Sequence, residues 1–276
     1  RCEVTDNEAA QSAGGLYLVT ATASCVRVTG NTAGQNAGGL YVDDGTARSC
    51  VVAGNTAAAN GGGVYMAASG ELCNLTVTGN GADTAGSGIY TEGGGVVRNC
   101  IAYFNTGLAA QDLRKGAGTV VEHTCSLPAS SGTGNFSSDP RLCAAGDGSL
   151  RCDSPCMDNG SNQPWMTGAL DIAGESRIWV QRDAHSGAVV DDTVDVGAYE
   201  STVKGAGMAK AEPGVMDVEW SVMEGARVRM QSSPTLAPPV WSDVVGGVVT
   251  AEQNSVTMPY TNATDRIQYL RLIWEK

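Results

Sequence analysis

Side chains that commonly carry catalysis are few in this chain of 276 residues. It has only two histidines, which are not spaced as a pair of metal ligands, and no Ser–His–Asp or Cys–His arrangement is recognisable. Carboxylates are more numerous, and a glycosidase needs two of them about 5–10 Å apart. In a repetitive chain, such a pair would stand at equivalent positions of neighbouring repeats. Asp43 and Asp44 are followed one period later by alanines, however, and Glu71 and Glu92 are not one period apart. The spacing therefore predicts no catalytic pair.

Cysteines are the second group that could do chemistry. Six of the nine recur every 23 to 27 residues, at Cys2, Cys25, Cys50, Cys73, Cys100 and Cys125. Because a buried cysteine behaves as a small hydrophobic residue, we expect these six to form one inward-pointing column. Neighbouring repeats would hold such cysteines within disulfide range, so vertical pairs could oxidise. Pairing among Cys143, Cys152 and Cys156 also fits an extracellular setting, whereas zinc is disfavoured because no second close cysteine pair accompanies Cys152 and Cys156.

Glycine pairs, tyrosines and asparagines keep the same period as the cysteines. Each repeat holds short β-rich runs separated by polar, glycine-bearing turns, and none has helical apolar spacing. This pattern predicts an all-β protein whose first part is a right-handed parallel β-helix with coils of about 24 residues. We expect two or three short strands in each coil, and coils stacked about 4.8 Å apart.

Two residue types in the repeat have structural roles. Glycine permits sharp corners and close approach of adjacent coils, and the pairs Gly38-Gly39 and Gly62-Gly63 are expected at such places. Asparagine tolerates left-handed backbone, and stacked asparagines can hydrogen-bond from coil to coil. We assign this role to Asn31, Asn55 and Asn80.

The domain organisation follows from where the repeats stop. We expect β-helix coils over 1–125 and the last coils with the C-terminal closure of the β-helix over 126–201. Spaced strand-like runs with Pro, Gly and Ser turns over 202–276 predict a small antiparallel β-sandwich-like module.

The succession of motifs resembles a known group of bacterial surface proteins. The Gly-Asn steps at Gly30-Asn31 and Gly54-Asn55 and the Gly-Gly-x-Tyr steps ending at Tyr41 and Tyr65 resemble polymorphic outer-membrane proteins and autotransporter-like passengers. The segments 154–160 (SPCMDNG) and 195–200 (DVGAYE) are similar to the ending of β-helix proteins of the choice-of-anchor Q type. That resemblance spans roughly residues 1–201 and implies a secreted or cell-surface protein, in most members without a demonstrated activity.

The resemblance also suggests roles for carboxylates near the end of the β-helix. Asp171 to Arg177 occupies the place of the family's Asp-x-x-Gly-x-x-Arg step, which implies a buried Asp–Arg contact closing the last coil. The alternative is a Ca²⁺ site, because Ca²⁺ prefers oxygen ligands, although the spacing does not match an EF-hand loop. The residues that would supply the oxygens are Asp158, Asp171, Asp195 and Glu200.

Charge and hydropathy exclude some functions. The formal net charge is −12 and lysines and arginines are not clustered, so we expect no nucleic acid partner. No apolar run is long enough to span a bilayer, so we expect no membrane insertion of this chain. The sequence opens at Arg1-Cys2 in the middle of a repeat, and we interpret it as a processed or truncated product with further coils upstream.

These observations favour an extracellular or cell-surface scaffold or adhesin without catalytic activity. Its expected partners are carbohydrate, another surface protein or copies of itself. One alternative is a polysaccharide-active β-helix enzyme, a lyase or glycoside hydrolase, or its carbohydrate-binding portion. Another is a self-assembling filament or surface-layer subunit that uses the unpaired strand edges of terminal coils.

Overall fold

The computed structural model divides the chain into two units. Unit 1 comprises residues 1–150 and 154–201, and unit 2 comprises 151–153 and 202–276. The described residues are 2–107, 111–143, 148–151, 154–178, 181–182, 189–191 and 193–200 in the first 200, and 209–211, 214–221, 227–233, 242–244, 248–250, 255–262 and 268–274 beyond them. The prediction of an all-β chain with a parallel β-helix and an antiparallel C-terminal module is confirmed.

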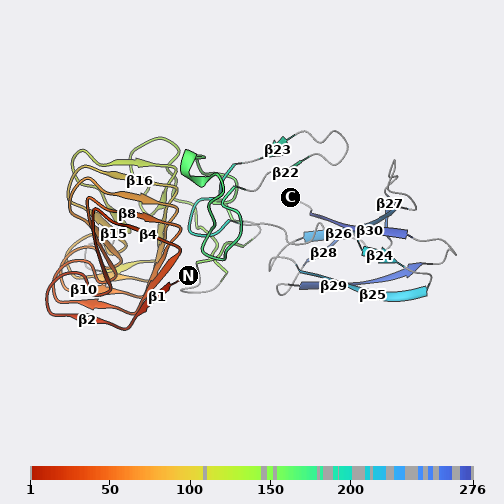
Figure 1. Ribbon diagram of the computed structural model, residues 1–276, viewed down its shortest axis with the longest axis horizontal. Helices are drawn as coiled ribbons and strands as arrows, with labels where there is room; N and C mark the ends of the chain where they lie inside the picture. Colours follow the sequence, from red (N-terminus) through yellow and green to blue (C-terminus); the bar gives the residue numbers. More distant parts are fainter. Residues whose placement is uncertain are drawn as a thin grey trace. The chain divides into compact units, whose positions relative to one another are not determined.

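Unit 1 is built from stacked coils whose strands form four parallel sheets (Figure 1). Sheet A contains β1 (Cys2–Thr5), β5 (Val26–Thr29), β9 (Val51–Ala53), β13 (Thr76–Thr78), β17 (Ile101–Tyr103) and β21 (Cys125–Ser126). Sheet B contains β2 (Glu8–Ala9), β6 (Thr32–Ala33), β10 (Thr56–Ala57), β14 (Gly81–Ala82) and β18 (Thr106–Gly107).

Sheet C contains β3 (Leu16–Val19), β7 (Leu40–Asp43), β11 (Val64–Met66), β15 (Ile89–Thr91) and β19 (Leu113–Arg114). Sheet D contains β4 (Thr22–Ser24), β8 (Thr46–Arg48), β12 (Glu71–Cys73), β16 (Val96–Arg98) and β20 (Val120–Glu122). Each coil therefore has four strands, where the sequence indicated two or three. The strands of sheet B were missed because two residues are too short to show alternation.

Small aliphatic side chains fill the interior of the coils. Inward positions of equivalent strands stack on one another, as in the column Leu40, Val64 and Ile89 of sheet C, and all three are fully buried. Gly39 shows why the corners need glycine, since a Cβ atom there would lie 2.8 Å from the carbonyl oxygen of Gly63 in the next coil. Narrow coils at this spacing accept only short side chains, in keeping with the abundance of Ala, Val and Gly.

Asparagine side chains form a hydrogen-bonded ladder that runs through the interior along the stack. Asn31 Nδ2 donates to Asn55 Oδ1 at 2.9 Å, and Asn55 Nδ2 donates to Asn80 Oδ1 at 2.9 Å. Each Oδ1 also accepts the backbone N–H of the asparagine one coil earlier, as in the 2.9 Å bond from Asn31 N to Asn55. The ladder begins at Asn7 and ends with Asn105 donating to Asp112 Oδ1 at 2.8 Å. It satisfies polar groups that the core would otherwise bury without partners.

The six periodic cysteines do not form a single inward column, which corrects the expectation from their spacing. Cys50 and Cys100 point into the core but are separated in their column by Leu75. Cys73 pairs in register with Arg48 and Arg98 on the outer side of sheet D, and Cys125 pairs with Ile101 on the outer side of sheet A. Cys2 pairs in register with Val26, and Cys25 lies at a corner with positive φ. A period that varies by one or two residues moves a side chain to a different face of a strand, which cysteine spacing alone does not show.

We call residues 154–200 the strap. Ile172, Val196 and Ala198 of the strap lie against the outer face of sheet A. The strap contains the 3-10 helix η1 (Pro164–Met166) and strands β22 (Gln181–Arg182) and β23 (Val189–Asp191). The strap buries Val51 and Ala53 beneath Ile172 and Ala198, and Ile101 beneath Val196. Its Tyr199 hydroxyl accepts a 2.8 Å hydrogen bond from Arg27 on β5, in the second coil. The strap therefore covers the side of the β-helix over several coils, rather than only closing its last coil.

Unit 2 is an antiparallel β structure of two small sheets. One pairs β24 (Ala209–Ala211), β30 (Gln268–Trp274), β26 (Arg227–Ser233), β27 (Ser242–Asp243) and β28 (Val249–Thr250), and the other pairs β25 (Gly214–Ser221) with β29 (Ser255–Asn262). Val228, Met230 and Met258 are among its buried side chains. Over the described residues of both units, no helix has the length and apolar character that crossing a membrane requires.

Candidate functional site

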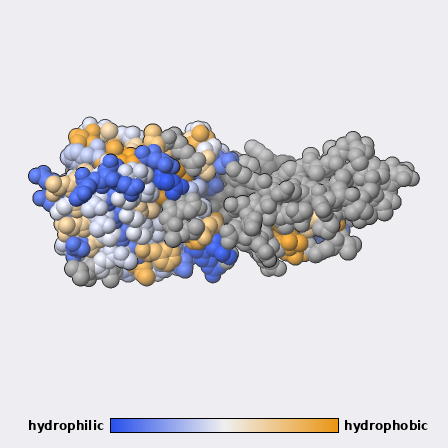
Figure 2. All heavy atoms as spheres, turned by 90° about the horizontal axis from the view of Figure 1, so that it is seen from below, coloured by the Kyte–Doolittle hydropathy of each residue, from blue (hydrophilic) through white to orange (hydrophobic). Residues whose placement is uncertain are grey.

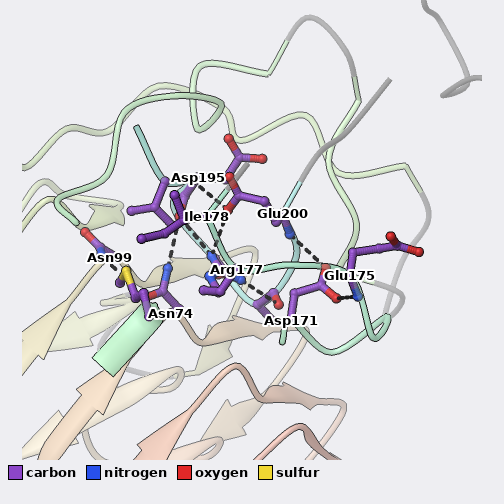
Figure 3. Close-up of polar contacts among 12 residues, drawn as sticks. Asn74, Asn99, Asp171, Glu175, Arg177, Ile178, Asp195 and Glu200 are labelled. Carbon is purple, nitrogen blue, oxygen red and sulfur yellow. Dashed lines mark hydrogen bonds and ion pairs between the residues drawn. The ribbon is translucent and has the colours of Figure 1, made fainter. Parts of the chain in front are cut away.

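Three of the four carboxylates predicted as calcium ligands surround a buried arginine (Figure 3). Arg177 is fully buried, and Asp171, Asp195 and Glu200 are nearly so. We call these four residues the Arg177 cluster. The guanidinium lies 3.6 Å from Glu200 Oε2, and it donates to the backbone carbonyl oxygens of Ala198 and Gly197 at 3.0 and 2.8 Å.

The carboxylates of the cluster accept backbone amides of the strap. Asp171 accepts the N–H of Glu175 at 2.8 Å through Oδ1 and that of Glu200 at 2.9 Å through Oδ2. Asp195 Oδ1 accepts the N–H of Asp158 at 2.8 Å, and Glu200 Oε2 accepts the N–H of Asp195 at 3.1 Å. These contacts fold the irregular strap into a fixed shape, which is a structural role.

Burial governs the protonation of this cluster. It raises the pKa of Glu200 to about 9, with the negative charge of Asp195 as the next cause, while Arg177 acts in the opposite direction. Burial also lowers the pKa of Arg177, although the three carboxylates oppose this. Since one guanidinium cannot compensate three buried carboxylates, the cluster holds a proton on Glu200 at neutral pH.

The fourth predicted ligand, Asp158, joins the cluster through its backbone N–H. Among the residues that the structure describes, no group of three or more His, Cys, Asp or Glu side chains is arranged to hold a metal ion. Asp171 Oδ1 and Oδ2, Asp195 Oδ1 and Glu200 Oε2 already accept hydrogen bonds from backbone amides, and Glu200 Oε2 also lies 3.6 Å from the guanidinium. The Ca²⁺ site and the Asp–Arg contact both stay predictions from the sequence, since the acidic partner of the Arg177 guanidinium in the structure is Glu200.

A second group of polar side chains lies on the outer face of sheet C. Tyr17, Tyr41, Tyr65 and Tyr90 are in register on β3, β7, β11 and β15, and successive ring centroids lie 4.7, 5.1 and 5.1 Å apart. Tyr17 is 54% exposed, Tyr41 and Tyr90 are half-buried, and Tyr65 is buried between its neighbours. We call this surface, with Asp43 and Glu92, the tyrosine face.

Asp43 and Glu92 border the tyrosine column at equivalent positions. Asp43 follows Val42 and Glu92 follows Thr91, which are matched through Met66 in the coil between them. The two carboxylates are thus two coils apart, or about 9.6 Å along the stack at ~4.8 Å per coil. Tyr65 donates its hydroxyl to Glu92 Oε2 at 2.8 Å, and Tyr17 donates to Asp43 Oδ2 at 3.4 Å.

The sequence missed this pair because only neighbouring repeats were compared. Asp43 and Glu92 are two periods apart. Ala67 stands 24 residues after Asp43, and Glu92 stands 25 residues after Ala67. The hydroxyls and carboxylates form a row of hydrogen-bonding groups at the edge of an aromatic column. Burial, followed by the hydrogen bond to Glu92, raises the pKa of Tyr65, so its phenol stays protonated and acts as a donor.

The arginines of the coils do not form one exposed row. Arg48 and Arg98 lie on sheet D, where they form ion pairs with Glu71 at 2.8 Å and Glu122 at 2.9 Å. The Trp165 ring of the strap lies 4.7 Å from the Arg48 guanidinium carbon. Figure 2 shows one face of the molecule, on which hydrophilic and hydrophobic side chains of the described residues are interspersed.

Comparison with known proteins gives a match over the coils alone. Residues 1–115 are similar to the NosD family. The matching family model is described as periplasmic copper-binding protein (NosD), a parallel β-helix type, and it covers less than half of the chain. No curated protein and no solved structure matches. The finer resemblance to choice-of-anchor Q proteins stays a prediction.

The described residues of this stretch do not fit a copper site, because no three or more of their His, Cys, Asp or Glu side chains are grouped so that they could hold a metal ion. Copper in proteins is bound by histidine, cysteine or methionine side chains, and residues 1–115 contain no histidine and a single methionine, Met66, which is fully buried in the core. Cys50 and Cys100 are buried on the inner side of the coils, where burial raises the pKa of their thiols to about 11 and about 12. Such thiols stay protonated at neutral pH and are poor ligands.

Proposed function

We propose that this chain is a rigid, non-catalytic scaffold of the cell envelope or cell surface that recognises a partner through the tyrosine face. The observation that carries the proposal is the contrast between two outer surfaces. Sheet A is covered by the strap, whereas the tyrosine face presents hydroxyl and carboxylate groups at a fixed repeat. The similarity of residues 1–115 to a periplasmic family supports a location outside the cytoplasm.

The partner class that suits this face is a neutral polysaccharide. Phenol hydroxyls and carboxylates hydrogen-bond to sugar hydroxyls, and a repeat every coil suits a partner that is itself repetitive. The net charge of −12 and the carboxylates of Asp43 and Glu92 disfavour acidic polymers through repulsion. Copper binding is not part of the proposal, because the matched residues do not fit that metal.

The test is to incubate the protein with insoluble neutral polysaccharides and with acidic ones, and to measure retained protein and released sugar together. We expect retention on a neutral polymer without cleavage. Tyr41→Ala and Asp43→Asn should lower retention several-fold, whereas Phe104→Ala, which removes an exposed aromatic outside this face, should not. Equal retention of all variants would reject the tyrosine face as the binding surface.

A second candidate is a glycoside hydrolase, because Asp43 and Glu92 stand on one face at a separation close to that of inverting enzymes, about 6.5–9.5 Å. Sugar release that Asp43→Asn and Glu92→Gln both abolish would establish this activity and reject the non-catalytic scaffold. Release that both variants retain would point to a contaminating activity.

A further inference from the structure

Two buried cysteines meet where the last coil contacts the strap. Cys125 is on β21 and Cys156 is in the strap, and both are completely buried in one apolar cluster with Ile101, Leu150 and Val196. The Cys156 thiol is the neighbouring group that most raises the pKa of the Cys125 thiol. Their positions are separated by 30 other residues in the sequence, so the cluster joins two segments that are distant along the chain.

The backbone on both sides of this contact is fixed. Cys125 N–H donates to the carbonyl oxygen of Cys100 in the preceding coil at 2.9 Å, and the Cys156 carbonyl oxygen accepts the N–H of Val196 at 2.8 Å. Cys156 N–H also donates to the Ser154 hydroxyl at 3.1 Å. Both cysteines therefore lie in one buried cluster on backbone that is held by hydrogen bonds, and a disulfide requires such closely placed cysteines.

We propose that Cys125 and Cys156 form a disulfide that fastens the strap to the end of the β-helix in an oxidising compartment. In the reaction, the two thiols lose two protons and two electrons and one S–S bond forms. A small-molecule or protein disulfide takes up the electrons and is reduced to two thiols. This pairing differs from the one that the sequence suggested, among Cys143, Cys152 and Cys156.

The other cysteines have different surroundings. Cys143 donates its thiol to the Leu150 carbonyl oxygen at 3.2 Å and is half-buried. Cys73 and Cys100 are both buried, but their thiols donate to Glu71 and to backbone carbonyls of Leu72 and Arg98. Cys152 lies outside the described residues. Cys125 also donates its thiol to a backbone carbonyl oxygen, that of Ser138 at 3.2 Å, and it shares its buried apolar cluster with Cys156.

The environment also predicts when the bond forms. The contact with Cys156 and burial both raise the pKa of Cys125, so the folded thiol is a weak nucleophile. Oxidation is therefore expected during folding, before the strap has covered β21. Once formed, the bond is shielded from reductants by the apolar cluster.

Peptide mapping tests the pairing directly. Cleavage before aspartates places Cys125, Cys143, Cys152 and Cys156 on four different peptides, 112–138, 139–146, 147–152 and 153–157. The full-length protein is refolded with a glutathione and glutathione-disulfide couple, alkylated, and digested without reduction. We expect 112–138 linked to 153–157, with a mass lower by two hydrogen atoms than the sum of the peptides. A dominant link to Cys143 or Cys152, or complete alkylation of Cys125, would overturn the proposal.

Thermal unfolding gives a second, independent readout. The oxidised protein should melt higher than the reduced protein by on the order of 5–10 °C, from the loop of about 30 residues that the bond closes. The double variant Cys125→Ser/Cys156→Ser should lose this redox dependence. Cys50→Ser, which changes a buried thiol elsewhere in the core, should keep it. A redox shift that persists in the double variant would also reject the pairing.

Discussion

Buried polar residues in unit 1 are accommodated in two ways. The asparagine ladder gives each neutral side chain several partners: Asn55 accepts from Asn31 and donates to Asn80 and to the Val28 carbonyl oxygen. The Arg177 cluster instead places charged groups together, with backbone amides and carbonyls completing their hydrogen bonds. In both cases removal of one member leaves others buried without a partner, which costs more than the lost bond alone.

Substitution of Asn55 tests the ladder. Asn55→Ala should lower the free energy of unfolding by roughly 2–4 kcal/mol, because the amide groups of Asn31 and the acceptor of Asn80 lose partners in the core. Thr56→Ala, the exposed neighbour in the same coil, should change it by less than about 0.5 kcal/mol. Urea unfolding measures both, and equal effects would show that the ladder does not stabilise the coils.

Glu200 gives the Arg177 cluster a specific pH dependence. Its pKa is about 9 in the folded protein against an ordinary value of 4.5, so between these values the folded state holds a proton that the unfolded state has lost. The contribution of Glu200 to the free energy of unfolding should thus fall as pH rises from about 5 to about 9. The slope is at most about 1.4 kcal/mol per pH unit. Glu200→Gln should flatten the profile over this range in urea titrations. An unchanged slope in the variant would assign the dependence to other groups.

At the scale of strands and coils, the close approach of neighbouring backbones controls which substitutions are tolerated. A Cβ atom on Gly38 would lie 2.4 Å from the Gly62 carbonyl oxygen, whereas one on Gly81 would meet nothing closer than the Thr106 oxygen at 3.5 Å. Neither glycine has a positive φ, so the two positions differ in the room available for a Cβ atom and not in backbone strain.

Gly38→Ala should therefore separate the coils locally and lower the unfolding free energy by roughly 2–4 kcal/mol. Gly81→Ala is the matched control and should be nearly neutral. Melting temperatures of the two variants, recorded side by side, decide the question: a neutral Gly38→Ala would mean that the coils can move apart without cost.

The periodic residues in the sequence indicate the β-helix, because glycine, asparagine and tyrosine recur once per coil. The cysteine columns could not be predicted in the same way, since a slip of one residue turns Cys73 and Cys125 to outer faces. The strap left a weaker signal: Val51 to Ala53 and Ile101 to Tyr103 are continuous apolar runs, typical of strands covered on both faces. The partners of Arg177 are mostly backbone carbonyls, whose positions depend on the folded strap and not on residue type.

At the scale of the whole chain, the two units have separate cores. The β-helix core is assembled from short coil-to-coil contacts, while unit 2 is assembled from antiparallel pairing of β25 with β29 and of β26 with β30. Separate cores predict separate unfolding.

Calorimetry of the full chain should show two transitions, and Asn55→Ala should lower the temperature of only one of them. The unchanged transition belongs to unit 2 under this interpretation. A single transition that shifts as a whole would show instead that the units unfold cooperatively.

The asparagine ladder also has a direction. Every side-chain amide donates to the coil that follows it, from Asn7 through Asn105, so the amide dipoles point the same way along the stack. The side-chain amide of each coil therefore has its full set of acceptors only when the following coil is in place. Asp112 ends the ladder, because a carboxylate accepts from Asn105 and has no amide to pass on. Its negative charge also faces the positive end of the aligned amide dipoles. One side chain therefore both terminates the ladder and compensates its dipole.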